Sequence, residues 1–91
     1  MQYFDADDVY LISFILLKQP EVESKTHFKV EAGRTVAKLP ADNSTFELIR
    51  QYSAGESVPA NEFSRMIKRI RGQFITKRNE TKGDFINGNY K

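Results

Sequence analysis

The most apolar run of the chain, VYLISFILL at residues 9–17, is the feature that most constrains the fold. A helix that crosses a bilayer needs roughly 20 apolar residues. This run is much shorter, and charged side chains flank it at Asp7, Asp8 and Lys18. It therefore predicts a helix that is buried on nearly all sides of a folded domain. The rest of the chain must supply the elements that cover it.

Length and composition limit the chain to one small domain. It has 91 residues, of which 40% are hydrophobic, with seven Phe and four Tyr. The absence of cysteine excludes disulfides, a thiolate nucleophile and Cys-ligated zinc, and suits a reducing compartment. The N-terminus has no basic region ahead of an apolar stretch, so we expect no secretory signal and a cytoplasmic location.

Polar residues mark the limits of the first helix. The Asp5 carboxylate is placed to accept hydrogen bonds from the first turn, so we expect the helix to start there. Asp7 and Asp8 suit the positive end of the helix dipole. Pro20 predicts the end of the helix, and the following residues, 19–24, read as a polar connection.

A β-hairpin is expected over residues 26–40, because Phe28 and Val30 alternate with polar side chains. A two-residue loop at Ala32 and Gly33 would place Ala37 beside Phe28. A three-residue loop with Gly33 in a bulge would place Val36 beside Phe28 instead. We favour the bulged loop, because alanine is poorly suited to positive φ.

Two more helices follow the hairpin. Ser44 and Glu47 have the spacing of a capping box, and Gly55 is a natural helix terminator. The second of these helices opens near Pro59, in its first turn. Its apolar stripe at helical spacing comprises Phe63, Met66, Ile67, Ile70 and Phe74. Gly72 weakens this helix by about 1 kcal/mol relative to alanine and favours a bend or an end there.

The expected fold is a single small α+β domain in the order α-β-β-α-α. The domain covers residues 1–78, and residues 79–91 form a polar, flexible tail. A two-stranded hairpin is not stable alone, so it packs on the helices or pairs through its open edge with a second copy in a homodimer.

The chain also resembles a short uncharacterised domain family of phages and bacteria. Members open with an aromatic residue and a Tyr-Leu-rich helix, then continue through a hairpin to a Tyr-x-x-Gly turn and a last helix with an early Phe. The resemblance covers roughly residues 3–75, and it implies a phage or mobile-element setting in bacterial cytoplasm. It transfers no chemistry. The matching residues are Phe4, Asp8, Tyr10, Leu11, Phe14, Leu16, Lys18, Tyr52, Gly55, Val58 and Phe63.

Charge is distributed unevenly along the chain. Residues 1–62 carry six basic and ten acidic side chains, whereas residues 63–91 carry eight basic and two acidic ones. The segment RMIKRIRGQFITKR, residues 65–78, has six basic residues and no acid. Ordinary solvated helices mix the two signs, since opposite charges four residues apart stabilise them. The segment therefore predicts a surface for anions, formed by Arg65, Lys68, Arg69, Arg71, Lys77 and Arg78.

Two functions from different classes are compatible with this surface. The first is a non-enzymatic accessory protein that binds DNA or RNA through its basic last helix. The alternative is a phage or mobile-element inhibitor that binds a host protein, of the anti-defence or anti-CRISPR type. Acidic groups folded over the basic side chains, for example Glu47 or Glu62, would argue against both anion-docking roles.

No recognisable pattern predicts catalysis, a metal or a cofactor. His27 is the only histidine, and no nucleophile stands at a familiar spacing from it. Asp5, Asp7 and Asp8 lack the further ligands of a calcium loop, and helix capping accounts for them. The serines have no nucleophile-elbow context. We therefore expect neither an enzyme nor a membrane-bound protein.

Overall fold

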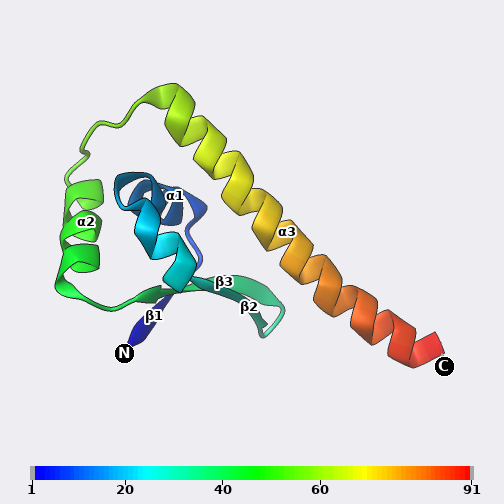
Figure 1. Cartoon of the computed structure of the whole chain (residues 1–91). Helices are drawn as coiled ribbons and strands as arrows, with labels where there is room; N and C mark the ends of the chain where they lie inside the picture. The colour runs from blue at the N-terminus through cyan, green and yellow to red at the C-terminus, as the bar shows by residue number, and fades with distance from the viewer. Residues whose placement is uncertain (1, 91) are drawn as a thin grey trace.

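In a computed structural model, which describes the backbone of residues 2–90 and the side chains of residues 2–80, helices cover one face of a three-stranded antiparallel sheet (Figure 1). The α+β class is confirmed, but the expected order lacked the first strand. The elements are β1 (Tyr3–Ala6), α1 (Val9–Lys18), the 3₁₀ helix η1 (Pro20–Lys25), β2 (His27–Glu31), β3 (Arg34–Pro40), α2 (Asn43–Ser53) and α3 (Ala60–Tyr90).

Strand β1 occupies the position where the sequence predicted the start of a helix. It pairs antiparallel with β3, which lies in the centre of the sheet order β1-β3-β2. Phe4 and Ala6 pack with the core, whereas Asp5 lies on the opposite face and binds Lys38 with Nζ 3.0 Å from Oδ1. The prediction that Asp5 caps the first helix is therefore wrong. Residues 3–6 form a short strand, in which successive side chains point to opposite faces of the sheet.

Helix α1 instead begins after Asp8. The Asp8 Oδ1 accepts hydrogen bonds from the backbone N–H groups of Tyr10 at 2.9 Å and Leu11 at 3.3 Å. Asp7 does not cap the helix either, because its carboxylate forms an ion pair with Arg34. Of the three aspartates to which sequence analysis gave one role, a single one caps α1.

The hairpin turn has two residues, so the predicted bulged loop is wrong. Ala32 and Gly33 both have positive φ, 51° and 79°, which is the backbone of a type I′ turn. Phe28 lies opposite Ala37 in this register. A shift of one residue would turn the apolar side chains of the strand away from the helices. Burial of that face therefore outweighs the strain at Ala32.

Helix α1 is the centre of the core, lying between α2 and α3 (Figure 1). Residues 12–16 are all buried, as the apolar run predicted. The one polar residue among them, Ser13, donates a hydrogen bond to the Val9 carbonyl at 2.6 Å. In the part of the chain that the structure describes, no helix combines the length and apolar character needed to cross a bilayer.

The segment between α1 and β2, which was expected to be a polar connection, contains a 3₁₀ helix. Helix α1 ends at Lys18, just before Pro20, and the next six residues form η1. Val22 of η1 is buried in the core. One apolar side chain among polar neighbours therefore anchors the segment.

Helix α2 is capped two residues earlier than predicted, at Asp42 instead of Ser44. Asp42 Oδ1 accepts from the Thr45 N–H at 2.9 Å, and the Ser44 hydroxyl donates to the same oxygen at 2.8 Å. The capping box at Ser44 and Glu47 is therefore wrong, since Glu47 instead pairs with Arg50. Gly55 terminates the helix with φ at 81°, as predicted.

Helix α3 begins at Ala60, with the Pro59 carbonyl accepting from the Phe63 N–H at 3.0 Å. It continues through Gly72 without ending there. The expected boundary between residues 78 and 79 does not interrupt the helix, whose backbone runs on to Tyr90. The flexibility of residues 79–91 stays a prediction, and the side chains of residues 81–91 lie outside the described part.

Candidate nucleic-acid interface

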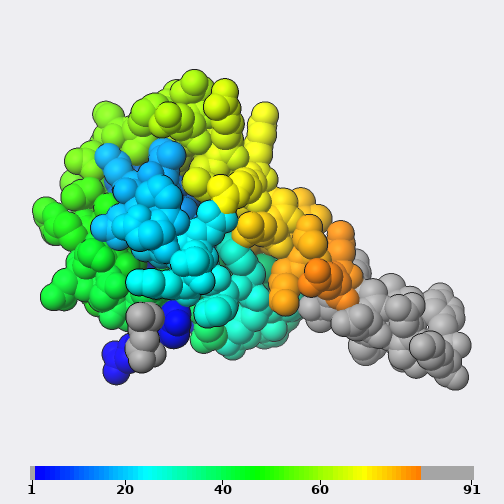
Figure 2. Space-filling view, viewed as in Figure 1, coloured from blue at the N-terminus to red at the C-terminus, as the bar shows by residue number. Residues whose placement is uncertain are grey.

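One side of helix α3 attaches it to the domain and fixes its rotation. Ile70 is fully buried. The Phe74 ring meets Phe28 of β2 edge-on, with ring centroids 5.8 Å apart, and the Thr35 hydroxyl of β3 donates to the Phe74 carbonyl at 3.3 Å. Figure 2 shows α3 (yellow to orange) along one side of the domain, next to the hairpin. The direction of every other α3 side chain follows from this attachment.

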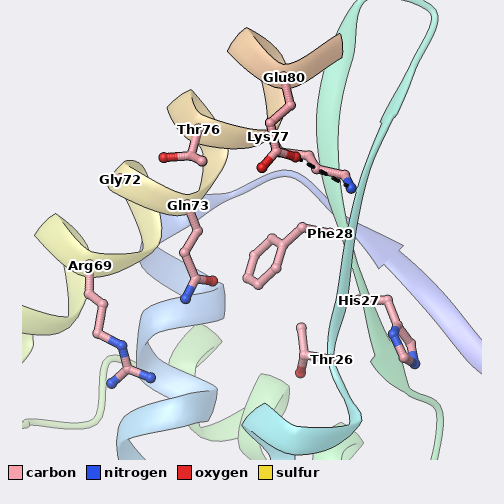
Figure 3. A pocket seen from close by; sticks show the side chains of 9 residues that line it. All are labelled: Thr26, His27, Phe28, Arg69, Gly72, Gln73, Thr76, Lys77 and Glu80. Atoms are coloured by element: carbon pink, nitrogen blue, oxygen red, sulfur yellow. Dashed lines mark ion pairs between the residues drawn. The ribbon is translucent and has the colours of Figure 1, made fainter. Parts of the chain in front are cut away.

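The fixed rotation divides the six predicted basic residues into two sets. At 3.6 residues per turn, four of them fall within an arc of about 140°; they are Arg65, Lys68, Arg71 and Arg78. We call this set the basic face. The other two, Arg69 and Lys77, lie on the flank that meets η1 and β2, where they line a groove with residues 26–28 (Figure 3). The single surface expected from the sequence is therefore two surfaces.

The two residues outside the basic face have acidic partners. The Arg69 guanidinium pairs with Glu23 of η1. The Lys77 Nζ lies 3.9 Å from a carboxylate oxygen of Glu80, one turn further along α3 (Figure 3). Their positive charge is partly compensated inside the protein, so they contribute less to the field around α3 than the sequence implied.

The basic face contains no acid in the part of α3 whose side chains are described. The acidic residues of that part are Glu62 and Glu80. They are five full turns apart and project on the same line, beside Arg69 and away from the basic face. Arg65, Lys68 and Arg78 are exposed and form no ion pair with another described side chain. Their charges therefore act together on the solvent in front of them.

Arg71 is held in place by a residue that sequence analysis did not assign to the site. Its Nη2 donates to the Tyr10 hydroxyl at 2.8 Å, and its guanidinium carbon lies 5.5 Å from the centre of the Tyr10 ring. Tyr10 supplies no negative charge, so Arg71 keeps its full charge while its side chain is ordered. The prediction missed this partner because 61 residues separate the two.

A second hollow lies where the basic face meets the hairpin turn. It has a volume of about 260 Å³, and Arg78 lines it together with Asp7 and Arg34. Arg34 was also missed, and no sequence signal places it next to α3, since its position depends on the hairpin register. Asp7 pairs with Arg34, so the charge of Arg34 is compensated and Arg34 does not extend the basic face.

Glu47 and Glu62, the acids that would have argued against anion binding, do not cover the basic face. Glu47 pairs with Arg50 on α2, one turn away on its own helix. Glu62 is exposed on the opposite flank of α3. A described acid from an earlier element that does pair with a predicted site residue is Glu23, whose partner is Arg69; Lys77 pairs with Glu80 of α3 itself. The surface suited to anions is therefore smaller than expected, because it comprises the four residues of the basic face instead of six.

His27 lies on the face of the sheet that the helices leave open. It is exposed, and its ring meets Tyr3 edge-on with centroids 5.6 Å apart. Within the described residues, no three His, Cys, Asp or Glu side chains come together as metal ligands would.

No protein-family model, curated protein or solved structure matches the chain. The resemblance to the phage and bacterial domain family consequently stays a prediction. What the site does has to be argued from its own geometry.

Proposed function

We propose that the protein is a non-enzymatic accessory protein that binds nucleic acid through the basic face of α3. The observation that supports this is the absence of acid, among the described side chains of α3, from an arc that carries four cations. From Arg65 to Arg78 the helix rises about 20 Å, at 1.5 Å per residue. That length matches about six phosphates along one strand of B-form DNA.

The chemistry of the face favours backbone contact over base reading. Three of the four residues are arginines, whose planar guanidinium groups bind phosphate oxygens through two hydrogen bonds. In the described part of the face, the asparagines lie only at its two ends, at Asn61 and Asn79, and no glutamine stands among the arginines. We therefore propose binding without strong sequence preference, as in other phosphate-dominated interfaces.

The test is fluorescence anisotropy with a labelled 20-base-pair DNA duplex, titrated at several salt concentrations. Four phosphate contacts predict a slope of about −3.6 for the logarithm of affinity against the logarithm of salt concentration. Replacing Arg65 or Arg78 with alanine should reduce the slope by about 0.9 each. A labelled single-stranded RNA of the same length reports whether the duplex is required.

Two matched variants control for the loss of charge alone. Arg69→Ala removes a cation from the same helix, and Arg50→Ala removes one from α2; both residues are paired with acids. Each should leave the slope unchanged within error. Absence of binding at low salt would overturn the proposal, and so would an equal loss in the control variants.

The setting of this function, in phages or bacterial mobile elements and in the cytoplasm, rests on the family resemblance and is part of the proposal. The rival function, docking onto a host protein, has its own support in the groove on the other flank of α3. The residues of that groove do not belong to the basic face.

A further inference from the structure

Strand β2 is an edge of the sheet in the order β1-β3-β2, and no other described strand pairs with its outer side. In the hairpin register, the pair formed by Glu31 and Arg34 closes the two-residue turn, so the backbone groups of residues 27, 29 and 31 point toward β3. The hydrogen bond from Ala41 N–H to the Gln2 carbonyl, 2.8 Å, fixes the same alternation on the other side of β3. The N–H and C=O groups of Phe28 and Val30 consequently point outward.

A groove runs beside this open edge, between β2 and α3. Its volume is about 540 Å³. Figure 3 shows the Phe28 ring in the gap between the strand and the helix, with Gly72, Gln73 and Thr76 on the helical wall. The groove thus combines an apolar floor, the outward-pointing backbone groups of β2 along one wall and a helix as the other wall. A strand docked against a sheet edge uses this combination.

Gly72 forms part of the helical wall of the groove. Glycine in a helix is unfavourable relative to alanine, and here it is not required by the fold. A Cβ at position 72 would meet no atom within 4 Å, and its φ is not positive. The missing side chain widens the groove where α3 lines it. This part of the helical wall is therefore open.

Gln73 offers a hydrogen-bonding group that the described protein does not satisfy. Its Oε1 is buried and has no hydrogen-bond donor. Figure 3 shows the carboxamide extending from α3 into the space in front of Phe28. Rotation about the last side-chain bond exchanges its oxygen and nitrogen, so the carboxamide can accept from a backbone N–H in the groove.

We infer that the groove between α3 and β2 binds an extended peptide segment of a partner protein. The segment adds a fourth strand at the edge of β2, pairs with the outward groups of Phe28 and Val30, and places an apolar side chain between Phe28 and Gly72. This inference does not rest on the proposed function, because no residue of the basic face takes part.

A second copy of the chain suits this edge less well than a single strand. The contact between Phe28 and Phe74 places α3 over β2. Pairing of two β2 edges about a two-fold axis would bring both α3 helices to the same side of the seam. An isolated extended peptide brings no helix with it.

The test begins with a phage-displayed library of random linear dodecapeptides, selected on the immobilised full chain. Peptides with an apolar residue at alternate positions should be enriched, and the consensus peptide is then synthesised. It should bind Gly72→Ala nearly as well as the natural chain. Gly72→Leu, which fills the groove with a good helix former, should weaken binding at least tenfold. Ser64→Leu is the matched control, because it adds the same side chain to α3 outside the groove.

Amide hydrogen exchange supplies a readout that does not depend on a variant. Binding of the synthetic peptide should slow exchange of the Phe28 and Val30 amides, whereas the Lys29 amide is protected with and without peptide. Failure to enrich peptides above the Gly72→Leu background would overturn the inference, and so would binding without new protection at Phe28 and Val30. Concentration-dependent protection of these amides in the free protein would assign the edge to a second copy and would also overturn it.

Discussion

Arg71 donates a hydrogen bond to the hydroxyl of Tyr10 across 61 residues of sequence, at 2.8 Å. The contact joins the last helix to the start of α1, next to the Asp8 cap. A side chain of the basic face is therefore ordered before any ligand arrives. Ordering an arginine in advance reduces the entropy lost when it binds phosphate.

A double-mutant cycle measures this contact. We expect Tyr10→Ala and Arg71→Ala to show a coupling of about 0.5 to 1 kcal/mol in the free energy of unfolding, the range of an exposed cation–aromatic pair. Urea unfolding of the four proteins gives the value. In the DNA titration, Tyr10→Ala should weaken binding less than Arg71→Ala does. Equal losses would mean that Tyr10 contacts the nucleic acid itself.

Ile70 holds α3 against the domain and should dominate its attachment. It is fully buried, so Ile70→Ala should lower the free energy of unfolding by about 3 kcal/mol, through lost burial and a residual cavity. Ile75 provides the comparison within the same helix, because it is 49% exposed. Ile75→Ala should change stability by less than about 0.5 kcal/mol. Similar effects of the two substitutions in urea unfolding would contradict the observed rotation of α3.

The hairpin turn contains strain that a substitution can remove. Ala32 has φ of 51°, a conformation that costs an L-residue about 1 kcal/mol or more. Ala32→Asn should therefore raise the free energy of unfolding by about 1 kcal/mol, because Asn-Gly suits a type I′ turn. Gly33→Ala, at φ of 79°, should lower it. Thermal unfolding measured by circular dichroism checks both, and a destabilised Ala32→Asn would refute the two-residue turn.

Acid should weaken the start of α2. The backbone N–H of Thr45, with the Ser44 hydroxyl next in importance, holds the pKa of the Asp42 carboxyl below its ordinary value of 3.8. A pKa that is lowered by folding stabilises the native state above the unfolded pKa, and the gain is lost as the pH falls through the folded pKa.

We therefore expect the urea midpoint to drop on acidification from about pH 5 to about pH 2. Asp42→Asn keeps a capping side chain that does not titrate, so its midpoint should drop less over the same range. Parallel curves for the two proteins would show that the Asp42 cap does not contribute to acid sensitivity.

Local sequence patterns were sufficient where an element is defined by its own residues. The apolar run predicted that α1 is buried, Pro20 and Gly55 marked helix ends, and alternation around Phe28 revealed the hairpin. Strand β1 was missed because its order comes from β3, more than 30 residues later. The bulged turn was preferred because the local cost at Ala32 was visible in the sequence, whereas the burial gained by the correct register was not.

The basic segment was visible in the sequence, but its division was not. Helical spacing alone places the six cations around α3, and it does not say which side of the helix meets the domain. Ile70, Phe74 and their tertiary contacts decide that. The pairing of Arg69 with Glu23 and the contact of Arg71 with Tyr10 both join distant parts of the chain, so the separation into a basic face and a groove required coordinates.

The rotation of α3 makes the protein sensitive to insertions and deletions within this helix. Deletion of one residue between Ile70 and Phe74 would turn everything downstream by about 100°, which would move Arg78 from one side of the helix toward another and displace Phe74 from β2. A substitution changes one side chain of α3, whereas an insertion or deletion changes the direction of every side chain that follows it. Natural variants of this protein should therefore differ in the identity of α3 residues far more readily than in their number.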